Sequence, residues 1–242
     1  MPRRTPYLRP WHSGQVVTLR TTRDAAQPFV TYYDGATGER TELSATSLRN
    51  WQSKTANYLR DGLAIDEGET VSLHLPPHWV VPIWVAATQL VGAQLRVAEV
   101  GEEQTVDLAV IGPDDVTNLP PANAYVACSL LPLAQPFADR LPVECEDYFD
   151  EVRQYGDFFS GSGAAAPNNP RADALKVANN WGLAQGDRFV VVAGSRLTSE
   201  SLLALYEVPL AIDGSVVIIA NSSAEQIADI TTQERAKATV DV

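Results

Sequence analysis

Residues 70–97, TVSLHLPPHWVVPIWVAATQLVGAQLRV, decide the fold. The stretch begins with a short apolar run of strand length, continues with an apolar stretch of helix length, and ends in a second strand-like run. Gly92 marks the end of the predicted helix, and Pro82 fits that helix only in its first turn, where its missing N–H is not needed. A strand, a helix and a second strand in this order predict parallel strands joined by a right-handed crossover.

The same order of elements recurs in the last third of the sequence. Residues 172–220 are consistent with a helix, a glycine-containing loop, a strand, a second helix and a second strand. The glycines that correspond in the two units are Gly62 and Gly182, Gly68 and Gly186, and Gly92 and Gly214. We interpret the match as an internal duplication; the alternative is that two unrelated α/β units share the pattern. The predicted fold is α/β, with two pseudo-repeated lobes whose largely parallel sheets are flanked by helices.

The predicted organisation divides the chain into four parts. Residues 1–27 form an Arg-rich N-terminal arm, residues 28–157 the first α/β lobe, residues 158–170 a linker, and residues 171–242 the second lobe. The alternative is that both lobes belong to one compact domain, which a chain of 242 residues allows.

Three local elements of the first lobe are also predicted. Residues 28–43 alternate in polarity around the turn sequence DGATG, which indicates a β-hairpin. Ser44 is placed to cap a helix that ends at Gly62. Residues 145–159, CEDYFDEVRQYGDFF, predict a short acidic helix.

Composition excludes several classes of partner and location. The chain has 18 Lys and Arg residues against 30 Asp and Glu, and its net charge of −12 repels nucleic-acid phosphates and anionic lipid. The most apolar stretch, residues 79–95, is shorter than a membrane span and contains Pro and Gln. The basic N-terminal segment is not followed by an apolar run, so no signal peptide is expected. We therefore expect a cytoplasmic protein without membrane insertion.

The segment FFSGSGAAAPNN, residues 158–169, has the small residues of a phosphate-binding loop. The candidate cofactor-binding residues are Ser160, Gly161, Ser162 and Gly163. A dinucleotide cradle needs a strand before the glycines and a helix after them, whereas a helical segment precedes them here, and Pro167 and Pro170 are expected to block an immediate long helix. The P-loop triplet G-K-[ST] is absent from the sequence. We interpret the segment as a hinge between the lobes rather than a cradle.

Other groups of reactive residues do not form a convincing site. His74 and His78 have the four-residue spacing of zinc ligands, but the two prolines between them forbid a regular helix. Ser195 follows a strand and has no evident base. We interpret the acidic residues as a solvated helix face: Asp147, Asp150, Glu151 and Asp157. We interpret the large aromatic residues as core anchors: Trp51, Tyr58, Trp79, Trp84 and Trp181. The two thiols, Cys128 and Cys145, are expected to be buried or inert. We predict no catalytic residue and no metal site.

Residues 30–93 resemble the opening of the adenylate-forming enzymes, the superfamily of acyl-CoA synthetases and AMP ligases. The resemblance rests on the hairpin, on the helix leading to "LRDGLAIDEGETV", and on the strand and helix ending in "VGA". Residues 28–242 resemble more closely a small actinobacterial family of uncharacterised AMP-binding-like proteins, through "TYYDGATGERTELSA", "DYFDEVRQYGD" and "WGLAQGDR". The resemblance implies the fold of the N-terminal domain of an adenylate-forming enzyme, here truncated.

Departures from the superfamily pattern shape the expected function. Adenylate-forming enzymes carry a loop T-S-G-[ST]-T-G-x-P-K, and the counterpart at residues 160–169 has no lysine; the only lysines are Lys54, Lys176 and Lys237. The later nucleotide-binding motifs and the C-terminal domain with its catalytic lysine have no counterpart before Val242. Because adenylation concentrates negative charge that cations must meet, we expect a non-catalytic remnant, a pseudoenzyme that acts as a binding or protein-interaction module.

Two alternatives stay open. One is a reduced adenylate-forming enzyme, or a nucleotide- or acyl-binding subunit, that takes the missing lysine from a partner chain. The other is a structural protein that forms a homo-oligomer through the repeat face. No cofactor is predicted as such, and the candidate ligands of the cleft between the lobes are an adenine nucleotide or an acyl group.

Overall fold

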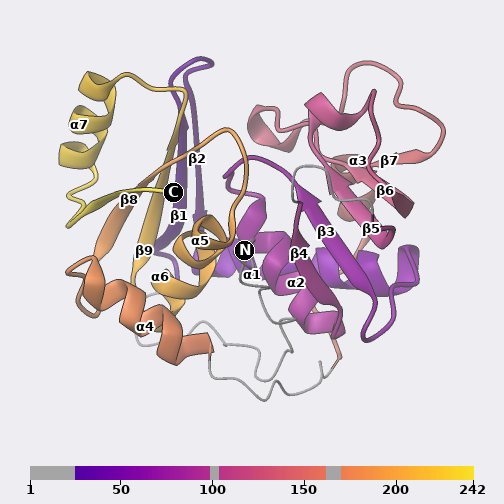
Figure 1. The fold of residues 1–242 in the computed structure, drawn as a ribbon, viewed down its shortest axis with the longest axis horizontal. Coiled ribbons are helices and arrows are strands. Elements are labelled where there is room, and N and C mark those ends of the chain that lie inside the picture. Colours follow the sequence, from indigo (N-terminus) through magenta and orange to yellow (C-terminus); the bar gives the residue numbers. More distant parts are fainter. Residues whose placement is uncertain (1–24, 99–103, 162–169) are drawn as a thin grey trace, which may run out of the picture.

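The computed structural model describes residues 25–98, 104–161 and 170–242 (Figure 1). The predicted arm, residues 1–27, therefore lies outside the described residues except for its last three positions. In the described part of the chain, strands form two five-stranded sheets that stand side by side (Figure 1). The first sheet has the order β10 (Thr239–Asp241), β8 (Arg188–Val192), β9 (Ser215–Ala220), β1 (Pro28–Asp34) and β2 (Glu39–Ser44). The second has the order β4 (Gln94–Val97), β3 (Thr70–His74), β5 (Val106–Ile111), β6 (Ala122–Ala127) and β7 (Cys145–Asp147).

Neighbouring strands in both sheets are parallel except β1 and β2, which form the predicted hairpin. The described helices and helical turns are α1 (Ala45–Asn57), η1 (Tyr58–Gly62), α2 (Val81–Val91), η2 (Pro113–Asp115), η3 (Pro132–Ala134), α3 (Tyr148–Glu151), η4 (Val152–Gln154), α4 (Pro170–Asn180), α5 (Ser199–Leu202), η5 (Leu203–Glu207), α6 (Val208–Ala211) and α7 (Ala224–Gln233). The predicted α/β class, with largely parallel sheets flanked by helices, is confirmed. Among the described helices, none has both the length and the apolar character needed to cross a membrane.

The helix ends follow the sequence signals. The Ser44 side chain accepts a hydrogen bond from the Ser47 N–H, 3.1 Å away, at the start of α1. Pro82 stands in the first turn of α2, and Gly92 ends that helix with a left-handed φ of 78°. The predictions for both helices are confirmed, because each signal acts on its own neighbouring backbone.

The two strand–helix–strand units match in their backbone hydrogen bonds. Gly68 and Gly186, which precede β3 and β8, have φ values of 90° and 86°. The N–H of Gly68 donates to the carbonyl of Gly92 at 3.0 Å, and the N–H of Gly186 donates to the carbonyl of Ile212 at 2.7 Å. The match is less complete at the end of the second unit, where Asp213 rather than Gly214 has a positive φ, 52°.

The sheets divide the chain differently from the predicted lobe boundaries. The hairpin strands, at residues 28–44, belong to the sheet of residues 188–241 rather than to that of residues 70–147. Register pairs Val30 with Val216 and Tyr32 with Ile218 across β1 and β9. Residues 29–32 are buried in succession, on both faces of the strand, so β1 needs a central place in a sheet covered on both sides.

Three elements differ from their predictions. Cys145–Asp147, expected as helix, is strand β7 because it pairs with the edge of β6, and helical structure covers only residues 148–154. The helix predicted from residue 172 is present as α4, which begins two residues earlier, at Pro170, a position where a helix tolerates proline. Helix α7 and strand β10, at the C-terminal end, were not predicted.

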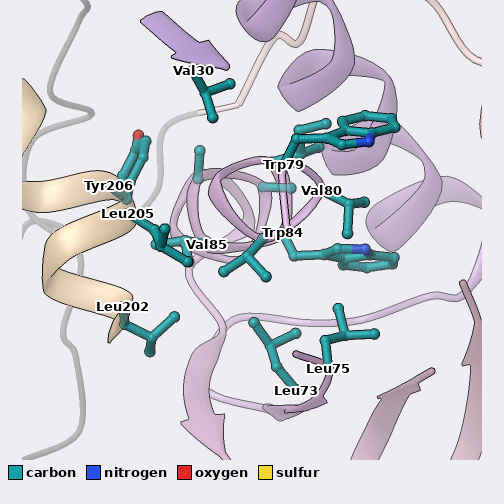
Figure 2. Close-up of a cluster of buried hydrophobic side chains, with 14 of the residues drawn as sticks. Val30, Leu73, Leu75, Trp79, Val80, Trp84, Val85, Leu202, Leu205 and Tyr206 are labelled. Carbon is teal, nitrogen blue, oxygen red and sulfur yellow. The ribbon is translucent and has the colours of Figure 1, made fainter. Parts of the chain in front are cut away.

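Helix α2 lies between the two sheets and joins their cores. Figure 2 shows Leu205 of η5 next to Val85 of α2, with Leu202 of α5 and Leu73 below them. These side chains belong to one continuous apolar cluster that takes residues from both sheets. The aromatic residues Trp79 and Trp84 are buried in this cluster, and Trp51 packs against it. Their prediction as core anchors is confirmed.

Candidate functional site

The described part of the predicted loop lies on the surface. Ser160 and Gly161 are exposed, and the other two candidates, Ser162 and Gly163, lie outside the described residues. A Cβ at Gly161 would stand 2.3 Å from the ring of Phe159, so a larger residue here would require that ring to move. The site prediction for these four residues stays a prediction.

The residues just before this loop, Tyr155–Phe159, form a stem that is fixed to α1. Lys54 Nζ donates to the carbonyl oxygen of Tyr155 at 2.6 Å and lies 2.8 Å from Asp157 Oδ1. Asn57 Nδ2, one helical turn further on, donates to the carbonyl oxygens of Gly156 at 3.0 Å and Phe158 at 2.9 Å. One face of the first helix therefore holds three carbonyl groups of the stem.

Aromatic contacts also hold the stem against η1, the helical turn that follows α1. The guanidinium of Arg60, in η1, lies 4.7 Å from the centroid of the Phe159 ring. The rings of Tyr58 and Tyr155 have centroids 5.3 Å apart. A Cβ at Gly62 would lie 2.2 Å from the hydroxyl oxygen of Tyr155, so this glycine lets the Tyr155 ring approach the helix closely. The stem is thus packed as well as hydrogen-bonded.

A depression of about 700 Å³ lies at the carboxyl ends of β8 and β10, where parallel α/β sheets commonly bind ligands. We call it the carboxyl-edge pocket; it is lined by Val192, Ala193, Gly194, Thr198, Ser199, Glu200, Asp241 and Val242. Valine and alanine side chains supply apolar surface, and Thr198 and Ser199 supply hydroxyl groups. Glu200 and Asp241 supply two exposed carboxylates. Among the described residues that line it, none is Lys, Arg or His.

The capping residues of the helix that begins at Ser199 already hydrogen-bond to each other. Thr198 Oγ1 accepts from the N–H of Ser201 at 3.0 Å, and the Thr198 N–H donates to Ser201 Oγ at 2.6 Å. Glu200, in the first turn, puts a carboxylate near the positive end of the helix dipole. The chain itself therefore supplies the negative charge that this helix end attracts.

The other groups considered from the sequence do not come together. Ser195 is exposed in the loop after β8, as expected. His78 is buried, and burial lowers its pKa to about 3 although the Asp34 charge opposes the shift. His74 Nε2 lies 2.9 Å from Ser72 Oγ. Among the described residues, no group of His, Cys, Asp or Glu side chains is arranged to hold a metal ion.

The acidic set serves separate structural roles instead of one site. Asp147 accepts from the N–H of Phe137 at 2.6 Å through one oxygen and from the N–H of Phe149 at 2.9 Å through the other. Asp157, which lies after η4, binds Lys54 of α1. These contacts, rather than a single solvated helix face, account for two of the four carboxylates.

Solved structures of similar architecture decide the fold. No protein-family profile matches the chain. An acyl-CoA synthetase of Brucella canis superposes with a TM-score of 0.73 at 14% identity, covering 96% of this chain and 48% of that one. The chain has the fold of the acyl-CoA synthetases.

Two further structures with the acyl-CoA synthetase fold give the same result. Acetoacetyl-CoA synthetase of Streptomyces lividans matches with a TM-score of 0.70 at 16% identity, over 93% of this chain and 41% of that one. MatB of Rhodopseudomonas palustris, in its apo form, matches with a TM-score of 0.65 at 12% identity, over 95% of this chain and 49% of that one. The chain therefore spans about half the length of the structures that share its fold.

A curated relative comes from Mycobacterium tuberculosis, the TIGR03089 family protein. It is 36% identical over 152 residues, which are 60% of this chain and 60% of that protein. The predicted resemblance to adenylate-forming enzymes is thus confirmed at the level of fold. The carboxyl-edge pocket and the attachment of the stem were not predicted. Thr198 and Ser201 form a helix-capping signal in the sequence. This signal marks the start of the helix that lines the carboxyl-edge pocket.

Proposed function

We propose that this chain is a non-catalytic domain with the acyl-CoA synthetase fold, which binds an uncharged acyl-type ligand in the carboxyl-edge pocket. The observation that carries the proposal is the charge of the pocket lining. Glu200 and Asp241, both carboxylate residues, are its charged side chains. A nucleotide polyphosphate would be repelled there, whereas an uncharged acyl group would meet apolar surface and hydroxyl groups.

The cations near the predicted phosphate loop also favour binding without adenylation. Adenylation requires positive charge directed at the phosphate groups in the transition state. Lys54, the lysine beside the stem, is engaged by Asp157 and by the Tyr155 carbonyl. Lys176, on α4, is paired with Asp173 at 2.9 Å. Each of these two lysines is thus paired with a carboxylate of the chain.

A reduced enzyme that borrows a catalytic lysine from a partner chain is the second candidate. It shares with the leading proposal the acyl-CoA synthetase fold, which is common to the solved structures and this chain.

Two measurements separate these functions. ATP–pyrophosphate exchange with a panel of carboxylic acids is expected to give no signal above a no-protein control, and exchange by the purified chain would overturn the non-catalytic proposal. Exchange that appears only after a cell extract is added would support the partner-dependent enzyme.

Thermal shift then tests the ligand class. Acyl thioesters of N-acetylcysteamine, which are uncharged, are expected to raise Tm in a concentration-dependent way, while ATP and AMP leave it unchanged. Ser199→Trp, which fills the pocket at the first helical position, should abolish the shift. Ala224→Trp, at the first position of α7, is the matched control and should retain it. Stabilisation by ATP and not by the thioesters would reject the assignment.

A further inference from the structure

The carboxyl-edge pocket contains two exposed carboxylate side chains, those of Glu200 and Asp241. In the part of the chain that the structure describes, neither side chain takes part in an ion pair. Val192, Ala193 and Val242 of the same lining supply apolar surface. A hollow that combines apolar surface with unpaired carboxylates is complementary to a segment that combines apolar and cationic side chains.

The sequence contains such a segment at its N-terminal end. Residues 1–23 hold five arginines and no Asp or Glu, whereas the rest of the chain holds 13 Lys and Arg residues against all 30 Asp and Glu. Residues 3–11, RRTPYLRPW, combine three of these arginines with Tyr7, Leu8 and Trp11, and we call them the arm segment. Arg, Tyr and Trp are the side chains that protein interfaces favour. No stretch of nine residues outside the arm carries three cationic residues and no acidic one.

The length of the chain before the first sheet allows the arm segment to reach the pocket. The carbonyl oxygen of Ala25 accepts from the N–H of Thr46 at 3.1 Å, which fixes the described chain to the start of α1 just before β1. The pocket lies at the opposite ends of the strands, and β1 is seven residues long. This length corresponds to about 23 Å, and the two steps from β1 through β9 to β8 add about 10 Å sideways. Residues 12–24 span about 43 Å when extended, which exceeds this path.

We propose that the arm segment docks in the carboxyl-edge pocket of its own chain, with its arginines at Glu200 and Asp241 and its aromatic side chains on the apolar lining. The docked segment excludes the acyl-type ligand, so the arm regulates access to the pocket. This regulatory part of the inference rests on the proposed function, whereas the docking itself rests on the charge and the apolar surface of the pocket.

Limited trypsin digestion of the full chain, followed by mass spectrometry of the intact products, tests the docking. Cleavage after Arg4 is the reporter, because the next arginine, Arg9, precedes a proline and is not cut. We expect Glu200→Lys/Asp241→Lys to be cleaved after Arg4 at least about threefold faster than the unmodified protein, because the two carboxylates no longer hold the arm segment.

Glu225→Lys/Asp229→Lys is the matched control, since it makes the same change of charge at two exposed positions of α7. Its cleavage after Arg4 should proceed at the rate of the unmodified protein. Equal rates for the unmodified protein and the pocket variant would overturn the docking. Protection that rises with protein concentration would place the arm segment on a second copy and overturn the contact within one chain.

A second variant keeps the test decisive if charge reversal in the pocket affects folding. Should Glu200→Lys/Asp241→Lys lower Tm by several degrees, Glu200→Gln/Asp241→Asn replaces it, with the same expected direction and the same ground for rejection.

The regulatory part is tested with an acyl thioester of N-acetylcysteamine. Because two occupants of one pocket exclude each other, a thioester concentration that raises Tm should also speed cleavage after Arg4 in the unmodified protein. A thioester that raises Tm and leaves this cleavage unchanged would overturn the regulatory role. If no thioester raises Tm while the pocket carboxylates still protect the arm segment, the proposed function fails and the docking stands, so the two failures are distinct.

Discussion

Arg188 and Glu234 form an ion pair that joins β8 to the end of α7, with 2.6 Å between Nη2 and Oε2. Their side chains are 17% and 11% exposed. Arg188 also donates to Thr31 Oγ1 at 2.7 Å and to Ser215 Oγ at 3.1 Å, and Glu234 accepts from the Tyr33 hydroxyl. One pair thus connects the C-terminal helix to strands β1, β8 and β9.

Arg188→Met is expected to destabilise the protein by about 2–4 kcal/mol, because it leaves the mostly buried Glu234 carboxylate without its main cation. Chemical denaturation monitored by circular dichroism measures the change. Lys176→Met breaks the exposed pair with Asp173 and should cost less than about 0.5 kcal/mol. Equal losses for the two variants would contradict the role assigned to Arg188.

The same pair makes stability sensitive to acid. Burial alone would raise the pKa of Glu234, but hydrogen bonds from Tyr33 and Arg188 and the charge of Arg188 outweigh it and lower the pKa. A lowered folded pKa gives stability that is present above about pH 4.3, the unfolded value, and is lost as pH falls through the folded pKa. Glu234→Gln should therefore lose stability at pH 7 and show a flatter decline below pH 4.3 than the unmodified protein. Glu225→Gln removes an exposed carboxylate of α7 and is the matched control.

The elements that the sequence predicts well are those whose signals are local. The β3–α2–β4 unit was predicted because the apolar runs, Pro82 and Gly92 all act within a few residues of one another. The partner of β1 was not, because its pairing with β9 joins residues 186 positions apart, such as Val30 and Val216. Periodicity shows that β1 is a strand but contains no information on which sheet receives it.

The contacts between the stem and α1 could not be predicted for the same reason, because they join residues far apart in the sequence. Lys54 and Asn57 lie on a helix whose pattern was read for its apolar face, and their carbonyl partners are about a hundred residues away. Asp157 was assigned to a solvated face because its spacing fits a helical stripe, yet η4 ends before it. Only the folded chain brings this lysine and this carboxylate together.

The loops before β3 and β8 have the same backbone geometry, so substitution of their glycines should have similar effects on stability. Gly68 and Gly186 hold φ values of 90° and 86°, which other residues adopt only under strain. Gly68→Ala and Gly186→Ala should each cost about 1–2 kcal/mol in denaturation experiments. Gly156→Ala is the control, since an added Cβ there meets no atom within 4 Å and the position lacks a left-handed φ. A cost in only one of the two loops would argue against their structural equivalence.

Glu207 lies in the interface between the repeats, where its Oε1 accepts from Gln89 Nε2 at 3.1 Å. Burial raises its pKa, and the hydrogen bond from Gln89 offsets only part of the shift. A raised folded pKa means that the native state keeps the proton longer, so stability declines as pH rises from about 4.3 through the folded pKa. Glu207→Gln cannot ionise and still reaches Gln89, so it should have the higher Tm at pH 8. Thermal melts should show this difference shrinking toward pH 4; a constant difference would refute the assignment.

His78 should produce the opposite slope, with stability falling as pH decreases. Its ring is buried between Tyr32, 4.4 Å away between centroids, and Trp79, 5.4 Å away. Burial lowers the pKa to about 3, so the unfolded chain takes up a proton below about pH 6.5 that the native state does not. Stability should therefore fall by up to about 1.4 kcal/mol per pH unit between pH 6.5 and pH 3 from this group alone.

His78→Phe keeps an aromatic ring at this position without a titratable nitrogen. We expect denaturation midpoints to change little at pH 8 and the decline between pH 6.5 and pH 4 to become shallower than in the unmodified protein. His74→Phe is the matched control, because that ring lies on β3 and is only half-buried. If His78→Phe and the unmodified protein lose stability in parallel across this range, the buried ring is not the acid-sensitive group.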